Sequence, residues 1–127
     1  MRALRTELGD PESFATQVDD QLRPEGYRLA GVFEDRAADA FAVAGFRVSH
    51  NISWGRHLYV DDLSTLPEAR RRGYARALLE WLLDEARRQH CEQFHLDSGV
   101  IFERVAAHRL YFNAGLWISA HHFAREM

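Results

Sequence analysis

The residues with the clearest chemical pattern are arginines gathered where a predicted strand leads into a predicted helix. Arg70, Arg71, Arg72 and Arg76 lie around Gly73 at the start of a long amphipathic segment. Cations at a helix N-terminus oppose the helix dipole by about 0.3 to 1 kcal/mol each, so we expect a negative group to offset them. Free backbone N–H groups, a glycine that lets a ligand reach the main chain and several guanidinium groups together favour a phosphate site. The alternative is a solvated basic patch.

Metal and thiol chemistry have little support in the sequence. The seven histidines form no His-Glu-x-x-His motif, and the adjacent His121 and His122 point apart if they lie on a strand. The single cysteine, Cys91, is expected to end the long helix, and we favour a buried structural thiol over a nucleophile. We interpret His108 as a packing residue, with a substrate contact as the alternative. We therefore expect no metal site.

The composition indicates one soluble globular domain spanning residues 1–127, with 46% hydrophobic and 28% charged residues. All sixteen basic residues are arginine, and the lack of lysine excludes a P-loop lysine and a Schiff-base lysine. The formal net charge of −3 argues against a nucleic-acid partner. No segment approaches the roughly 18 apolar residues of a membrane span, and no signal peptide is recognised. We predict a cytoplasmic protein with no membrane partner.

The apolar periodicity predicts an α/β (α+β) fold, a mixed central sheet flanked by helices. A helix is expected to begin at 10–11 and to end near 24–26, after which a hairpin of two strands follows. The predicted later elements alternate: strands over 27–33, 40–48, 55–66, 94–96 and 116–125, and helices over 72–90 and 102–114. Gly115 is predicted to end the last helix as its left-handed C′ residue.

Two motifs resemble signatures of the GNAT (GCN5-related N-acetyltransferase) superfamily. Arg70-x-x-Gly73-x-Ala75, between a strand and a long helix, is similar to the family's pyrophosphate signature Arg/Gln-x-x-Gly-x-Gly/Ala. Ala107, then Tyr111 four residues later and a glycine with a hydrophobic residue at the helix end, resemble the second signature. The resemblance covers the chain from about residue 27 onward. It implies a GNAT-like fold that uses acetyl-CoA.

The resemblance also implies which residues contact acetyl-CoA. Leu63, Ser64 and Thr65 match the strand that offers main-chain groups to pantetheine. Arg104 falls where many relatives place an asparagine that contacts the cofactor. The residues that match the pyrophosphate loop are Arg70, Arg71, Arg72, Gly73, Tyr74, Ala75 and Arg76.

Catalytic roles follow from the same resemblance. Tyr111 matches the tyrosine that donates a proton to the leaving CoA thiolate. An amine must lose a proton before it attacks, and relatives use a carboxylate on the strand that precedes the pyrophosphate loop. Alternation places Asp61 and Asp62 on opposite faces of that strand, so only one can face the cleft. We favour Asp61, because strict alternation places it on the same face of the strand as Tyr59 and Leu63. The alternative is that either acid only hydrogen-bonds to a loop.

The resemblance implies an N-acetyltransferase in which acetyl passes directly from acetyl-CoA to a small-molecule or peptide amine in one ternary complex. The alternatives are a catalytically silent acyl-CoA-binding regulatory module and an interaction domain without a cofactor. Residues 1–8 are too few for the first strand and helix of the family, so the N-terminal elements are expected to be shortened. A sheet edge left open in this way favours a homodimer.

Overall fold

The computed structural model describes residues 11–33, 40–66 and 73–127. It divides into two compact units, Met1–Leu96 and Asp97–Met127. We refer to the first as the sheet unit and to the second as the C-terminal unit, and each is described by itself.

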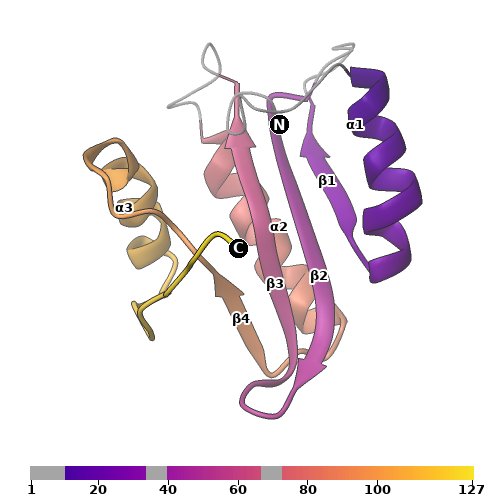
Figure 1. The fold of residues 1–127 in the computed structure, drawn as a ribbon. Helices are drawn as coiled ribbons and strands as arrows, with labels where there is room; N and C mark the ends of the chain where they lie inside the picture. The colour runs from indigo at the N-terminus through magenta and orange to yellow at the C-terminus, as the bar shows by residue number, and fades with distance from the viewer. Residues whose placement is uncertain (1–10, 34–39, 67–72) are drawn as a thin grey trace. The chain divides into compact units, whose positions relative to one another are not determined.

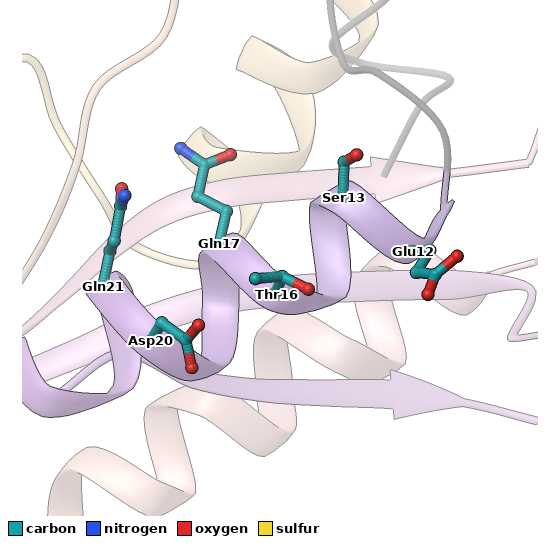
Figure 2. A pocket seen from close by; sticks show the side chains of 6 residues that line it. All are labelled: Glu12, Ser13, Thr16, Gln17, Asp20 and Gln21. Atoms are coloured by element: carbon teal, nitrogen blue, oxygen red, sulfur yellow. The ribbon is translucent and has the colours of Figure 1, made fainter.

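The sheet unit opens with a helical stretch of changing pitch. The α-helix α1 (Pro11–Gln17) continues as the π-helix η1 (Val18–Leu22) and the 3₁₀-helix η2 (Arg23–Glu25). Gly26, with φ of 90°, ends it, as predicted from the Pro and Gly signals there. One face is polar and lines an open hollow (Figure 2); its residues are Glu12, Ser13, Thr16, Gln17, Asp20 and Gln21. This face is interpreted as the solvated side of an amphipathic helix.

The described strands form a single mixed sheet in the order β1-β2-β3-β4 (Figure 1). The strands are β1 (Arg28–Val32), β2 (Ala42–Asn51), β3 (Gly55–Thr65) and β4 (Gln93–Leu96). The first three are joined in antiparallel pairs, and β4 pairs with β3 in parallel. A parallel neighbour requires a crossover connection, and the long helix between β3 and β4 provides it. The predicted mixed sheet with flanking helices is confirmed.

The helix α2 (Tyr74–Arg88) covers one face of this sheet (Figure 1). Its apolar residues recur at three and four positions, which places them on one stripe toward the strands. Phe46 and Leu58 of the sheet and Leu78 and Leu82 of the helix are among the fully buried side chains. The core cluster consists of Ala42, Ala44, Phe46, Leu58, Val60, Leu78, Leu82 and Ala86. Part of the opposite face is also apolar, because Phe14 of α1, Leu29 of β1 and Val43 of β2 line a hollow there.

The C-terminal unit contains the 3₁₀-helix η4 (Phe102–Arg104) and the helix α3 (Val105–Asn113). Gly115 follows with φ of 88°, which confirms its predicted left-handed conformation. The predicted strand over 116–125 is wrong, because residues 116–127 contain no strand. Trp117 and Phe123 are 77% and 93% exposed there. Apolar alternation alone does not make a strand, because a strand also needs a hydrogen-bonded neighbour.

A buried carboxylate connects α2 to the edge strand β1. Glu85 is only 6% exposed, and its oxygens lie 2.9 Å from Arg28 Nη2 and 3.1 Å from Arg88 Nε. Burial alone would raise the pKa of Glu85, but the hydrogen bonds and charges of Arg88 and Arg28 more than offset it. The pKa of Glu85 therefore lies below its ordinary value, and ionised Glu85 stabilises the fold.

We predict that Glu85→Gln lowers the free energy of unfolding by about 1 to 3 kcal/mol at pH 7, because charged hydrogen bonds are lost. A group whose pKa is lowered by folding contributes stability above its unfolded pKa and loses it as the pH falls through the folded value. Urea unfolding of the wild type and of Glu85→Gln should therefore show a difference in the free energy of unfolding that becomes smaller as the pH falls. Asp84→Asn, which breaks only the exposed pair with Arg87, is the control and should cost less than about 0.5 kcal/mol.

Candidate functional site

Among the described residues, no side chain caps or crowds the N-terminus of α2. Gly73 is the N-cap, with φ of 81°, and no side chain caps the helix there. The first turn contains no acidic residue, so the backbone N–H groups have no carboxylate near them from the helix itself. A Cβ added to Gly73 would meet no atom of the described chain within 4 Å. These features agree with an anion site at this helix end, and the anion site stays a prediction.

The side chains around this helix end are only partly described. Arg76 pairs with Glu80 at 3.1 Å on the exposed helix surface, so its charge is partly offset within the helix. Tyr74 stacks on Phe41, with ring centroids 5.2 Å apart, and Ala75 is half-buried. The predicted pyrophosphate residues Arg70, Arg71 and Arg72 lie outside the described residues.

β3 is much longer than its parallel partner. The pairing of β3 with β4 ends at Val60 and Leu96, whereas β3 continues to Thr65. Over those last residues, Leu63, Ser64 and Thr65 pair with β2 on one side only, within the described strands. The other edge of β3 therefore offers main-chain groups along which an extended ligand can bind as an added strand would. This edge is where the resemblance placed pantetheine.

The two acids of β3 lie at a β-bulge. Gly45 of β2 pairs with Asp62, but the next residue, Phe46, pairs with Val60, so Asp61 is the extra residue on β3. A bulge interrupts the alternation of side chains along a strand and increases the local twist. The faces of the two acids therefore cannot be read from their positions in the sequence.

The contacts of the acids show that both lie on the face opposite α2. Asp61 accepts two hydrogen bonds from Arg47, at 2.9 Å and 2.8 Å, and Tyr27 donates its hydroxyl hydrogen to Asp62 at 2.8 Å. Arg47 and Gly45 are two residues apart on β2 and so share a face, and the Tyr27 ring lies directly over Gly45. The prediction that the two acids point to opposite faces is wrong, because the bulge places an extra residue between them.

The bulge also separates residues that a regular strand would align. Tyr59 pairs with Arg47 before the bulge, and Leu63 pairs with Ala44 after it. Arg47 and Ala44 are three residues apart on β2 and therefore point to opposite faces. Tyr59 and Leu63 therefore do not share a face. The argument that favoured Asp61, because alternation would place it on the same face as both, is wrong as well.

Sequence reasoning missed three residues that hold the bulge: Arg47, Tyr27 and Gly45. Arg47 is 42% exposed and Asp61 20%, so their ion pair is partly shielded from water. The bond to Asp61 outweighs burial and raises the pKa of Arg47. A Cβ on Gly45 would clash with the Tyr27 ring, so only glycine fits. A glycine inside a strand pattern signals a bulge or close approach, and this signal was present in the sequence.

An aromatic cluster lies farther along the same face. Trp54 stacks on His95, with ring centroids 3.6 Å apart, and lies nearly parallel to Tyr59 at 6.4 Å. His57 is buried beside them, with Nδ1 3.0 Å from the Gly55 carbonyl oxygen and Nε2 3.3 Å from a serine hydroxyl. The carbonyl can only accept, so His57 carries its hydrogen on Nδ1 when neutral. These contacts account for Trp54 and His57 as packing residues.

The catalytic tyrosine implied by the resemblance belongs to the C-terminal unit. Tyr111 lies on α3 and is 8% exposed. Burial raises the pKa of Tyr111, and the charge and hydrogen bond of Arg104 partly counteract this effect. His108 Nε2 lies 2.8 Å from the Gly99 carbonyl oxygen and 3.1 Å from Ser98 Oγ. The structure therefore gives His108 polar partners, where the sequence favoured packing with a substrate contact as the alternative.

Three further features of the described chain bear on its chemistry. Cys91 is half-buried against the core cluster, and burial raises the pKa of its thiol, as expected for a structural cysteine. Among the described residues, no three His, Cys, Asp or Glu side chains gather as metal ligands would. Nor does any described helix combine the length and apolar character needed to cross a bilayer.

Comparison with known proteins identifies the family. A family model described as "Acetyltransferase (GNAT) family" matches residues 2–115. The "Uncharacterized N-acetyltransferase YhdJ" of Bacillus subtilis (strain 168) is 37% identical over 111 residues, 87% of this chain and 75% of that protein. The fold matches "a probable acetyltransferase" with a TM-score of 0.79, 21% identity and coverage of 99% and 83%. It also matches aminoglycoside N-acetyltransferase AAC(6')-Iy in complex with CoA, with a TM-score of 0.72, 15% identity and coverage of 91% and 87%.

The chain therefore belongs to the GNAT family of acetyltransferases, as its two motifs predicted. It is an acyltransferase enzyme, and the family uses acyl-CoA as its donor. The prediction of an acyltransferase enzyme is confirmed. The individual site residues stay predictions that the geometry above makes testable.

We predict that Gly73→Val weakens CoA binding at least tenfold, measured by calorimetry on folded protein. A valine cannot easily adopt φ of 81°, and its branched side chain would fill the space through which a phosphate reaches the backbone. Gly26→Val is a matched control, because Gly26 has φ of 90° and equally open space in the described chain. It should suffer the same backbone strain and keep its CoA affinity. Equal affinities for the two variants would contradict the anion site.

Proposed function

We propose that this enzyme transfers the acetyl group of acetyl-CoA to a primary amine by direct attack in a ternary complex. The observation that carries the proposal is the part of β3 beyond Val60, which has no described strand along its outer edge and precedes the open N-terminus of α2. An extended edge followed by an anion site suits a long ligand with phosphates at one end. The acceptor is a small-molecule or peptide amine.

The described residues fit the donor in two respects. The main chain of Leu63, Ser64 and Thr65 would hold the pantetheine arm, because amide groups there can pair with an extended chain. The backbone N–H groups after Gly73 would hold the pyrophosphate, with Arg76 near it. Arg70, Arg71 and Arg72 are proposed to add charge at that end. The donor supplies a thioester, whose acetyl carbon is the point of attack.

Tyr111 is the proposed general acid. When the amine nitrogen bonds to the acetyl carbon, the tetrahedral intermediate must break its C–S bond and expel a thiolate. A phenol can give its proton to the sulfur as this bond breaks. Burial raises the pKa of Tyr111, so the phenol keeps its proton at neutral pH until the reaction requires it.

Asp61 is the proposed acceptor of the amine proton. Both of its oxygens are bonded to Arg47, which stabilises the carboxylate anion and orients it at the bulge. The same ion pair occupies both carboxylate oxygens, so a variant that removes only the ion pair is needed to separate its structural role from the chemical role of Asp61. Asp62 lies on the same face and is the competing candidate.

We propose a homodimer on the basis of the strand order in the described sheet. β1 is an edge strand of the described sheet, and its outer side pairs with no described strand. An unpaired edge exposes a row of backbone groups that a second copy can satisfy.

We predict that Tyr111→Phe lowers kcat by about 10²-fold while the fold and the affinity for CoA stay nearly unchanged. The phenylalanine keeps the ring and loses only the proton donor, and general acids typically contribute about 10²- to 10⁴-fold. A thiolate is a fair leaving group even without a proton donor, so we expect an effect at the low end of this range. Steady-state kinetics against a panel of amines, at saturating acetyl-CoA, measures it. Equal kcat values for the two proteins would exclude Tyr111 as the acid.

We predict that Asp61→Asn lowers kcat by about 10²-fold or more, whereas Arg47→Gln lowers it only several-fold. Both variants break the same ion pair, but only Asp61→Asn removes the carboxylate. The ratio of their kcat values therefore isolates the chemical role of the carboxylate. Asp62→Asn tests the competing acid in the same assay. If Arg47→Gln and Asp61→Asn lose activity equally, the ion pair is structural and Asp61 is not the base.

A further inference from the structure

An apolar hollow lies on the face of the sheet opposite α2. Its walls come from α1 and the hairpin of β1 and β2, and they include Phe14, Leu29, Gly31, Phe33, Ala40 and Val43. Its volume is about 330 Å³, near the lower end of the range of about 300 to 1,000 Å³ for small-molecule pockets. Leu29 and Phe33 are 40% and 58% exposed, so apolar surface there is in contact with water. The hollow therefore suits one small apolar group.

A glycine keeps part of this hollow open. A Cβ at Gly31 would lie 3.1 Å from Phe33 Cε2 and 3.2 Å from Ala40 Cβ, which belong to two other walls. Any larger residue would therefore project its side chain into the space between these walls. Glycine weakens a strand interior and often marks a place where a ligand or another backbone approaches closely.

The register of the strands places the hollow on the same face as the two acids. Residues that pair across antiparallel strands point to the same face. Leu29 pairs with Gly45, which pairs with Asp62, and Val43 pairs with Ser64, two residues after Asp62. Neighbouring strands lie about 4.8 Å apart, so the walls on β2 and β1 lie about 5 and 10 Å from β3 across the sheet.

Tyr27 connects the hollow to the acids. Its ring lies over Gly45, in the row between Leu29 and Asp62, and its hydroxyl donates to Asp62 at 2.8 Å. The surface along this row therefore changes from apolar carbon at β1 to a carboxylate at β3. A pocket with apolar walls and a few polar groups at one end is typical of small-molecule sites.

The two ends of this surface match the two ends of an apolar amine. An aliphatic amine arrives as an ammonium ion, and a carboxylate has about four lone-pair positions, so Asp61 and Asp62 can accept from it besides their bonds to Arg47 and Tyr27. An alkyl or aryl group in the hollow is removed from water, which favours binding. An acceptor with hydroxyl groups or a second charge would instead place polar groups against apolar walls without partners.

We propose that the hollow binds the apolar end of the acceptor, so that this enzyme acetylates amines whose nitrogen carries, about 5 to 10 Å away, one small alkyl or aryl group. The inference rests on the proposed acetyl transfer to a primary amine. The nitrogen forms its bond to the acetyl carbon and gives up a proton at β3 while the C–S bond breaks, and the amide and CoA leave. The hollow takes no part in these steps and holds only the far end of the acceptor.

The first test measures binding without any acetyl transfer. The full chain is mixed with CoA, which carries no acetyl group, and ligand-detected NMR measures the affinity for a series from propylamine to heptylamine. Each methylene that enters the hollow should tighten binding about two- to fourfold. 2-(2-Methoxyethoxy)ethylamine has as many heavy atoms as heptylamine and the same charge, and should bind at least tenfold more weakly. Equal affinities for these two amines would overturn the proposal.

Matched valines locate the effect. Val43→Thr places a hydroxyl in the wall of the hollow and should weaken heptylamine about fivefold, while propylamine, which is too short to reach the wall, is unaffected. Val48→Thr is the control, because Val48 lies half-buried on the same strand but packs against the core on the other face. Leu29→Gln changes another wall at an exposed position and gives a second measurement if Val43→Thr does not fold. Equal effects of Val43→Thr and Val48→Thr would contradict the subsite.

Kinetics separate this subsite from the proposed reaction. At saturating acetyl-CoA, Val43→Thr should lower the ratio of kcat/KM for heptylamine to that for its ether analogue about fivefold and leave the KM for acetyl-CoA unchanged. Equal kcat/KM values for the two amines in the wild type would overturn the subsite and leave the acetyl transfer intact. Binding that follows the expected pattern without any acetylation would support the subsite and refute the transfer.

Light scattering tests the other possible occupant, a second copy of this chain. If Val43→Thr or Leu29→Gln converts a dimer to a monomer and leaves the preference for heptylamine unchanged, the hollow is covered by a partner subunit and the acceptor subsite is overturned. The proposal expects an unchanged molecular mass in both variants.

Discussion

The candidate site depends on a difference in length between two neighbouring parallel strands. β3 spans Gly55–Thr65 and β4 only Gln93–Leu96, so their hydrogen bonding stops at Val60. Beyond that point β3 is held from one side by β2, and the described sheet does not cover its other edge. A sheet normally gains stability by pairing every strand along its length. Here part of that pairing is given up, and main-chain groups stay available next to a helix N-terminus.

The β-bulge at Asp61 places charge at the start of this uncovered edge. The extra residue is stabilised by Arg47, and the facing glycine leaves room for Tyr27, which bonds Asp62. Each of these contacts ties the bulge to β2 or to the chain just before β1. The acids are therefore held in fixed positions although the strand is irregular there. Position, and not only residue type, makes them candidates for proton transfer.

The sequence predicted the elements better than the contacts between them. Periodicity located α2 and the hairpin because their apolar residues face one core, and Gly115 marked a left-handed position. The bulge shifts the alternation by one residue, so Val60 and Leu63 face the same core although they are three residues apart. A rule that assumes strict alternation therefore failed across it. The strand predicted over 116–125 failed for a related reason: a pattern shows which face is apolar and says nothing about a pairing partner. The Arg104 and Ser98 contact likewise depends on a loop that brings the two residues together.

The choice of arginine for every basic position has a chemical consequence for an enzyme that acetylates amines. The sequence has no lysine, and within the sheet unit each ion pair between described residues uses a guanidinium as its cation. A guanidinium stays protonated and is a poor nucleophile toward a thioester. No side chain of this protein is a primary amine, so the enzyme offers its own acyl donor no lysine to modify. The arginine ion pairs of the sheet unit therefore keep their charge throughout repeated exposure to a reactive thioester.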